Sequence, residues 1–109
     1  MTHLLDTNIC SAFLKQPGRL AHRFIQHGGG LCLSTIVLGE LYAWAERSTS
    51  GRLHRLIESD LLSIAELLDF DRRAAEVFGR IRIDSKTRGT NIEPVDLMIA
   101  AVAIEQDLT

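Results

Sequence analysis

Leu4-Leu5-Asp6-Thr7-Asn8 is the stretch of this sequence that indicates the fold most strongly. Two apolar residues end in a carboxylate close to the N-terminus, which is typical of a short buried strand in an α/β sheet. In open α/β folds, ligands bind just beyond the carboxyl ends of the strands, which is where Asp6 would lie. A simpler interpretation is that Asp6 only caps the helix that follows it.

The composition indicates one small domain and narrows the classes of partner. The 109 residues carry a net charge of −2, and 46% of them are hydrophobic, which is ample for a core. A weakly negative chain has no overall attraction for nucleic acid or acidic membranes, so binding of any polyanion would need a metal or a local basic patch. Because no segment is long and apolar enough for a membrane span or a signal peptide, we expect no membrane and a cytoplasmic location. Cys10 and Cys32 are expected to be free core thiols.

Apolar periodicity predicts strands that alternate with helices along the whole chain. The expected strands cover residues 2–5, 31–33 and 64–70, and the expected helices cover residues 9–15, 20–25, 36–47, 53–61, 74–81 and 94–106. This alternation is typical of an α/β fold with a mostly parallel sheet and right-handed crossovers.

Two further acids occur where this fold would place a site. Glu40 shares a helix face with Val37 and Trp44, so we expect it on the buried side, where a carboxylate needs a partner or a metal. Asp96 lies in the first turn of the last helix and is followed by apolar residues three, four and seven positions on. Each acid also has an ordinary alternative, since Glu40 can turn out to solvent and Asp96 can serve the helix dipole.

Asp6, Glu40 and Asp96 are together expected to converge at one edge of the sheet. Clustered carboxylates repel each other unless a cation lies among them, and oxygen ligands suit Mg²⁺ or Mn²⁺. Such an ion can activate water for attack on a phosphodiester. Ser34 has no histidine placed to activate it, so helix capping is its expected role.

Three stretches of the sequence resemble the motifs of PIN-domain proteins, most closely the VapC-type toxin ribonucleases. They are Leu4–Asn8, Leu33–Leu41 and Pro94–Ala101, in the same order along the chain. The resemblance implies a flavodoxin-like three-layer α/β/α sandwich, a Mg²⁺ or Mn²⁺ site and endonucleolytic cleavage of RNA. It also implies a cognate antitoxin that blocks the site.

The resemblance further assigns roles to individual residues. By motif, Asp6, Glu40 and Asp96 match the catalytic acids of the metal site, and Asn8 and Ser34 match polar residues that support the first acid. In the family, another strand, a Thr-x-Asn segment and a fourth acid follow the point where this sequence stops. The resemblance therefore implies a single PIN-like domain over residues 1–109 that is incomplete at its C-terminus.

Several alternatives stay open at this level. Arg80, Arg82 and Lys86 are candidate RNA contacts, and a solvated helix face is the other interpretation of the same cluster. The chain could also be a catalytically inactive module that binds antitoxin or other PIN chains. An aspartate-dependent phosphohydrolase would usually carry a second Asp two residues after the first, where this sequence has Asn8.

The C-terminal region leads us to expect a homodimer or a larger assembly. Residues 97–104 are apolar on every face of the expected helix, and the first strand would have one unpaired edge. A second copy could bury either surface. The alternative is a C-terminal segment that refolds to cover both surfaces from within the chain.

Overall fold

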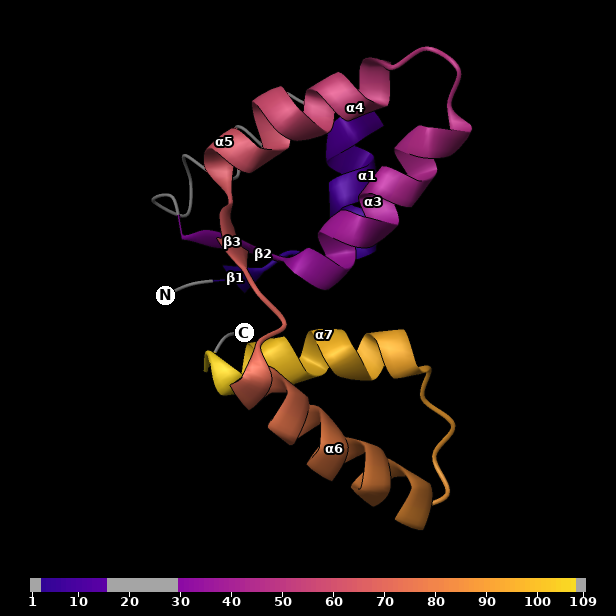
Figure 1. Cartoon of the computed structure of the whole chain (residues 1–109), viewed down its shortest axis with the longest axis vertical. Coiled ribbons are helices and arrows are strands. Elements are labelled where there is room, and N and C mark those ends of the chain that lie inside the picture. Colours follow the sequence, from indigo (N-terminus) through magenta and orange to yellow (C-terminus); the bar gives the residue numbers. More distant parts are fainter. Residues whose placement is uncertain (1–2, 16–29, 108–109) are drawn as a thin grey trace.

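The computed structural model describes residues 3–15 and 30–107 (Figure 1). Three parallel strands pair in the order β1-β2-β3. Their bounds are His3–Leu4 for β1, Leu31–Ser34 for β2 and Glu66–Leu68 for β3. Because parallel strands end at the same edge of a sheet, the segments that follow β1 and β2 are brought together there.

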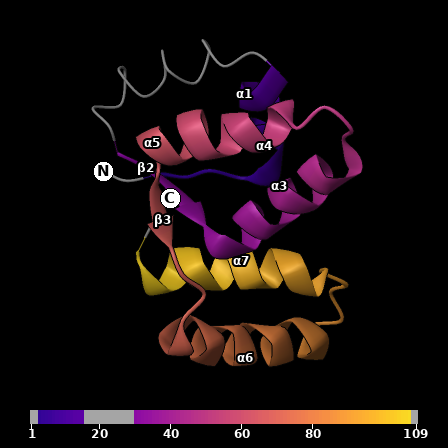
Figure 2. The same ribbon diagram turned by 45° about the horizontal axis from the view of Figure 1, so that its top comes forward.

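Helices flank this sheet on both sides. Their bounds are Thr7–Lys15 for α1, Thr35–Arg47 for α3, Arg52–Leu56 for α4, Ile57–Leu61 for the π-helical turn η1, Leu62–Ile64 for α5, Arg72–Thr87 for α6 and Pro94–Glu105 for α7. Figures 1 and 2 show α1, α4 and α5 on one side of the sheet and α6 and α7 on the other. The expected three-layer α/β/α arrangement with a parallel sheet is confirmed. The helix expected over residues 20–25 lies outside the described residues, and none of the described helices is long and apolar enough to cross a membrane.

Side-chain caps fix where three of the helices begin. Asp6, Ser34 and Asp71 each accept a hydrogen bond from the backbone N–H three residues further on, at 2.8, 3.1 and 2.9 Å. Each bond satisfies one of the N–H groups that a helix leaves unpaired in its first turn. The capping roles considered for Asp6 and Ser34 from the sequence are therefore present in the structure.

The main core lies between the sheet and the helices α1, α3 and α4 to α5. Its buried members are Leu5, Cys10, Leu14, Leu31, Leu33, Val37, Leu41, Ala45, Ile57, Leu61 and Ala65. On α3 the buried residues are spaced four apart, so they form one stripe along the helix. Cys10 and Cys32 are buried and free, as the sequence predicted.

Three elements differ most from the limits that the sequence indicated. The helix expected over residues 53–61 continues through α5 to Ile64, so the third strand begins only at Glu66. This strand ends at Leu68, because the backbone N–H of Phe70 donates to Thr35 Oγ1 at 3.2 Å and the chain has left the sheet by that point. The helix expected over residues 74–81 runs from Arg72 to Thr87. Its additional turns contain mostly polar and exposed residues, so they lack the regular spacing of apolar residues from which the helix was predicted.

Helix α7 is less exposed than the sequence suggested. It packs against α6 and also contacts α3, and Leu97, Ala101 and Val102 are buried. An ion pair of 4.0 Å between Arg73 and Glu105 joins the start of α6 to the end of α7, so the two helices run antiparallel. Part of the apolar surface of α7 still faces solvent, since the Ile104 side chain is 56% exposed.

Candidate functional site

A pocket of about 350 Å³ lies beyond the carboxyl ends of β1 and β2. Its lining comes from the start of α1, the middle of α3 and the first turns of α7. The lining residues are Asp6, Thr7, Asn8, Glu40, Asp96 and Ile99. Three carboxylates that are far apart in the sequence therefore border one space.

A hydrogen bond crosses the rim of this pocket. Thr7 Oγ1 donates to Glu40 Oε1 at 2.8 Å and links α1 to α3. Glu40 is exposed, so the expectation that it lies on the buried side of its helix is wrong. The buried stripe of α3 contains Val37 and Leu41, and successive helical residues are about 100° apart, which leaves Glu40 beside the stripe.

Asp6 both caps a helix and borders the pocket. One of its carboxylate oxygens caps α1, and the residue is among those that line the pocket. Its negative charge also acts on Cys10: burial, and to a smaller extent this charge, raise the pKa of the Cys10 thiol to about 12. The thiol is therefore a neutral packing residue and takes no part in nucleophilic chemistry at physiological pH.

Two helix N-termini face the acids. Thr7 and Asn8 are the first residues of α1, and Asp96 lies in the first turn of α7. The positive ends of these helix dipoles offset part of the negative charge that the carboxylates gather. The remaining charge makes the pocket suited to a cation.

The family model for the PIN domain matches residues 3–109 of the sequence. The chain belongs to the PIN-domain family. A tRNA(fMet)-specific endonuclease VapC from Salmonella typhimurium is 36% identical to it over 101 residues, which are 92% of this chain and 76% of the relative. A ribonuclease VapC2 from Haemophilus influenzae is 34% identical over 109 residues, which are 99% of this chain and 83% of the relative. The resemblance to VapC-type proteins is thereby confirmed.

Solved structures agree with this family. The crystal structure of DNA-bound VapBC from Salmonella typhimurium contains a chain that superposes on this PIN domain with a TM-score of 0.89 at 35% identity. The superposition covers 99% of this chain and 83% of that chain. The expected PIN-like α/β fold is therefore confirmed.

The donor atoms of this PIN domain suit a hard divalent cation. The pocket offers carboxylate oxygens together with the side chains of Thr7 and Asn8, and Mg²⁺ and Mn²⁺ prefer oxygen ligands. As the described side chains stand, no three acids, histidines or cysteines are close enough to hold one ion. Because Asp6, Glu40 and Asp96 are all exposed, they can turn toward a shared cation without repacking the core. Their catalytic and metal-binding roles stay predictions.

The two supporting residues expected from the motifs lie in different places. Asn8 is exposed and borders the pocket. Ser34 is fully buried, and its hydroxyl caps α3 by accepting from the Val37 N–H, so it fixes the start of the helix that carries Glu40. Ser34 does not line the pocket, and the supporting roles of Asn8 and Ser34 stay predictions.

The candidate RNA contacts lie on α6, away from the residues that line the acidic pocket. Arg80 is exposed and lines a different hollow, on the outer side of α6. Arg82 lies over the ring of Phe78, with its guanidinium carbon 5.7 Å from the ring centroid. Lys86 is exposed near the end of the same helix. Their contacts with RNA stay predictions.

Thr7 and Ile99 are the lining residues that sequence reasoning did not single out. No local spacing indicates the contact of Thr7, because its partner Glu40 is 33 positions away. Ile99 is one of the apolar residues that follow Asp96 in the sequence. Its position three residues after Asp96, on the same side of the helix, is the signal that could have placed it at the pocket.

Proposed function

We propose that this chain is a metal-dependent endoribonuclease of the VapC toxin type. The observation that carries the proposal is the pocket that Asp6, Glu40 and Asp96 all line within a PIN domain. Two VapC relatives at 34–36% identity are named as an endonuclease and a ribonuclease. Cleavage of an RNA phosphodiester is the reaction that this acid set and this family favour together.

Asp6, Glu40 and Asp96 are the residues that would hold Mg²⁺ or Mn²⁺. When bound there, the ion supplies Lewis-acid activation of water and neutralises charge on the phosphodiester. Asp6 is anchored by its cap bond to α1 and Glu40 by the hydroxyl of Thr7, so these two carboxylates are partly oriented before any ligand binds, and rotation of the exposed side chains would complete the site. Neutralisation is essential, because the unbound pocket carries three carboxylates and repels an RNA phosphate.

The test is RNA cleavage measured with and without divalent cation. We expect cleavage with Mg²⁺ or Mn²⁺ and none with excess chelator. The initiator tRNA is the first substrate to assay, because the Salmonella relative is named for it. Cleavage that continues in excess chelator would overturn the proposed chemistry.

Asp6→Asn is the decisive variant, because asparagine caps helices about as well as aspartate but carries no charge. We expect its unfolding temperature to stay near that of the wild type and its cleavage to fall below detection. Asp71→Asn is the matched control, since Asp71 caps α6 in the same way and does not line the acidic pocket. It should cleave like the wild type. If neither the wild type nor Asp71→Asn cleaves RNA but both bind an antitoxin, the chain is an inactive binding module.

The partners follow from the same proposal. We propose that a cognate antitoxin binds this chain and blocks its pocket, and that the chain acts on RNA in the cytoplasm. The Salmonella structure that it resembles is a VapBC complex. We also propose that the chain associates with a second copy of itself. Co-purification with the product of a neighbouring gene, together with inhibition of cleavage by that product, tests the antitoxin.

A further inference from the structure

One side of α3 leads from the acidic pocket along the helix. Trp44 and Arg47 lie four and seven positions after Glu40, and residues at these spacings share one face of a helix. Glu40 and Arg47 are exposed, and Trp44 is half-buried. An acid of the pocket, an aromatic ring and a cation therefore follow one another along this side of α3.

Trp44 is anchored by packing but is not fully covered. Its side chain packs against the main core, beside the buried stripe that contains Leu41 and Ala45. Its indole Nε1 forms no hydrogen bond with any described residue, and none of the described side chains has a buried nitrogen or oxygen atom without a partner. The Nε1–H of Trp44 therefore reaches solvent, where it can donate to a ligand.

Helix geometry places Trp44 next to the acidic pocket. Each residue adds about 1.5 Å of helix length, so Trp44 lies about 6 Å beyond Glu40 along the axis and Arg47 about 10 Å beyond it. Side chains lean toward the N-terminus of their helix, so Trp44 covers the surface on the Glu40 side of its own position. A polymer held at the acids can reach Trp44 and Arg47 without leaving this side of α3.

Arg47 is a cation without an acidic partner among the described residues. The ion pairs of the described side chains do not include it, and it is exposed at the end of α3. The three carboxylates of the pocket repel a polyanion until a cation binds there. A positive charge about 10 Å from Glu40 supplies an attraction that the pocket itself lacks.

This combination of groups suits single-stranded RNA. Bases stack on aromatic side chains, and cations bind the phosphates of the same strand. Proteins recognise RNA mostly in single-stranded loops, where unpaired bases are free to stack on a side chain. An aromatic ring and a cation beside candidate metal-binding acids therefore match the order of groups along one RNA strand.

We propose that Trp44 and Arg47 form a binding subsite for single-stranded RNA that adjoins the acidic pocket. Trp44 stacks against a base next to the phosphate held at the acids, and Arg47 binds a flanking phosphate. The inference rests on the proposed ribonuclease function for the identity of the substrate. It assigns to Trp44 and Arg47 a part in RNA binding and none in the chemical step.

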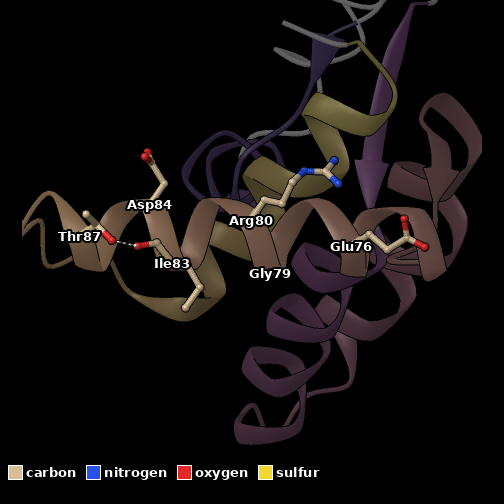
Figure 3. Close-up of a pocket in the computed structure, with 6 residues that line it drawn as sticks. All are labelled: Glu76, Gly79, Arg80, Ile83, Asp84 and Thr87. Atoms are coloured by element: carbon tan, nitrogen blue, oxygen red, sulfur yellow. Dashed lines mark hydrogen bonds between the residues drawn. The ribbon is translucent and has the colours of Figure 1, made fainter.

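The outer side of α6 lacks this combination of a free cation and an open ring. Figure 3 shows Arg80 between Glu76 and Asp84, so a phosphate at this cation would meet an acid on either side. The one aromatic ring of α6, that of Phe78, has the guanidinium carbon of Arg82 5.7 Å from its centroid. The side of α3 that carries Trp44 is therefore the better surface for an unpaired base.

The first experiment uses the fluorescence of Trp44, which is the single tryptophan of the chain. Asp6→Asn is titrated with a single-stranded RNA oligonucleotide in Mg²⁺, because this variant should not cleave the RNA. We expect the indole emission to fall to a plateau as RNA binds, since a stacked base quenches it. Binding of a labelled strand, measured by anisotropy, with no change in the indole emission would overturn the role of Trp44.

Variants of Trp44 separate a binding role from a structural one. Trp44→Ala should raise KM for RNA cleavage by about tenfold and leave kcat near the wild-type value, because it removes binding contacts alone. Trp44→Phe keeps an aromatic ring and should restore most of the affinity. Circular dichroism and Mn²⁺ binding verify that each variant keeps its fold and its acidic pocket.

Tyr42→Ala is the matched control for Trp44→Ala. Tyr42 is also a half-buried aromatic residue that packs against the core, but it bonds Glu58. Residues two apart on a helix are separated by about 200°, so Tyr42 lies on the other side of α3 from Trp44. We expect wild-type KM in Tyr42→Ala. An unchanged KM in Trp44→Ala, or the same rise in both variants, would overturn the subsite.

The salt dependence of RNA binding tests Arg47. Loss of one phosphate contact on a single strand lowers the slope of log K against log salt concentration by about 0.7. We expect this decrease for Arg47→Gln and none for Arg52→Gln, which removes an exposed cation from the first turn of α4. The wild-type slope in Arg47→Gln would show that Arg47 binds no phosphate and would overturn its part in the proposal.

The outcomes keep this inference apart from the proposed function. If the wild type cleaves RNA and Trp44→Ala cleaves it with the same KM, only the subsite is wrong. If RNA quenches Trp44 to a plateau but no protein cleaves it, the subsite is supported and the endonuclease proposal is wrong. If the emission changes on dilution of RNA-free protein and does not respond to RNA, Trp44 lies in a contact between copies and the inference is overturned.

Discussion

Thr7 Oγ1 donates a hydrogen bond to Glu40 Oε1 over 2.8 Å, and this contact joins two elements whose sequences are 33 positions apart. The bond uses one of the lone-pair sites of the Glu40 carboxylate and leaves the others for a ligand in the pocket. Thr7 stands between Asp6 and Asn8 at the start of α1. The first turn of α1 therefore positions an acid of its own and an acid of α3.

The Thr7–Glu40 bond predicts an effect of Thr7→Val on metal binding. Valine keeps the shape of threonine and removes the donor, so the Glu40 carboxylate loses its fixed orientation. We expect Mn²⁺ affinity, measured by calorimetry, and kcat/KM for RNA cleavage to fall by about tenfold, the scale of one hydrogen bond to a charged group. Thr7→Ser keeps the hydroxyl and should stay near the wild type. Equal affinity and cleavage in Thr7→Val and the wild type would show that the bond has no positioning role.

Stability should depend on divalent cation if the acids bind it. A ligand at about 100 times its dissociation constant stabilises the folded state by about 2.7 kcal/mol, so the unfolding temperature should rise with Mn²⁺. Glu40→Gln should reduce this rise. Glu58→Gln is the control, because Glu58 is also exposed and accepts a hydrogen bond, from Tyr42, without lining the acidic pocket. The same rise in both variants would place the cation elsewhere.

The Cys10 thiol predicts a loss of stability in alkaline solution. Burial and the charge of Asp6 raise its pKa from 9.0 to about 12. At a pH above the Cys10 pKa of the unfolded chain, the unfolded chain binds fewer protons than the folded one. The free energy of unfolding is therefore unaffected below that pKa and decreases as the pH rises toward the pKa of the folded chain. The decrease approaches about 1.4 kcal/mol per pH unit. Urea unfolding near neutral pH and at about pH 10 measures it, and Cys10→Ala should show a shallower decrease. An unchanged slope in that variant would show that another group titrates.

Leu41 tests the core beneath the site. Its side chain is 1% exposed, in the buried stripe of α3. Leu41→Ala should cost about 2–5 kcal/mol of unfolding free energy, because a buried cavity remains. Leu67→Ala makes the same chemical change at a side chain that is 42% exposed and should cost less than about 1 kcal/mol. Similar costs for the two variants in urea unfolding would contradict the described packing.

The sequence by itself determined the local structure of this protein. Strands and helices follow from apolar period, and the beginnings of α1 and α3 follow from Asp6 and Ser34, whose caps reach only three residues along the chain. The spacing of three motifs also placed Asp6, Glu40 and Asp96 at one edge of the sheet, because parallel strands and the helices after them meet there. These features depend on interactions within a few residues or on a general rule of α/β folds.

The tertiary structure alone decided which side chains meet. Glu40 was expected on the buried side and is exposed, since the packing of α3 against the sheet turns the stripe through Val37 and Leu41 inward. The bond from Thr7 and the antiparallel packing of α6 on α7 join residues far apart in the sequence. Such contacts depend on how each helix is rotated about its axis and on the angle at which neighbours cross. Both are set by the packing of the whole core, and no local pattern of residues contains them.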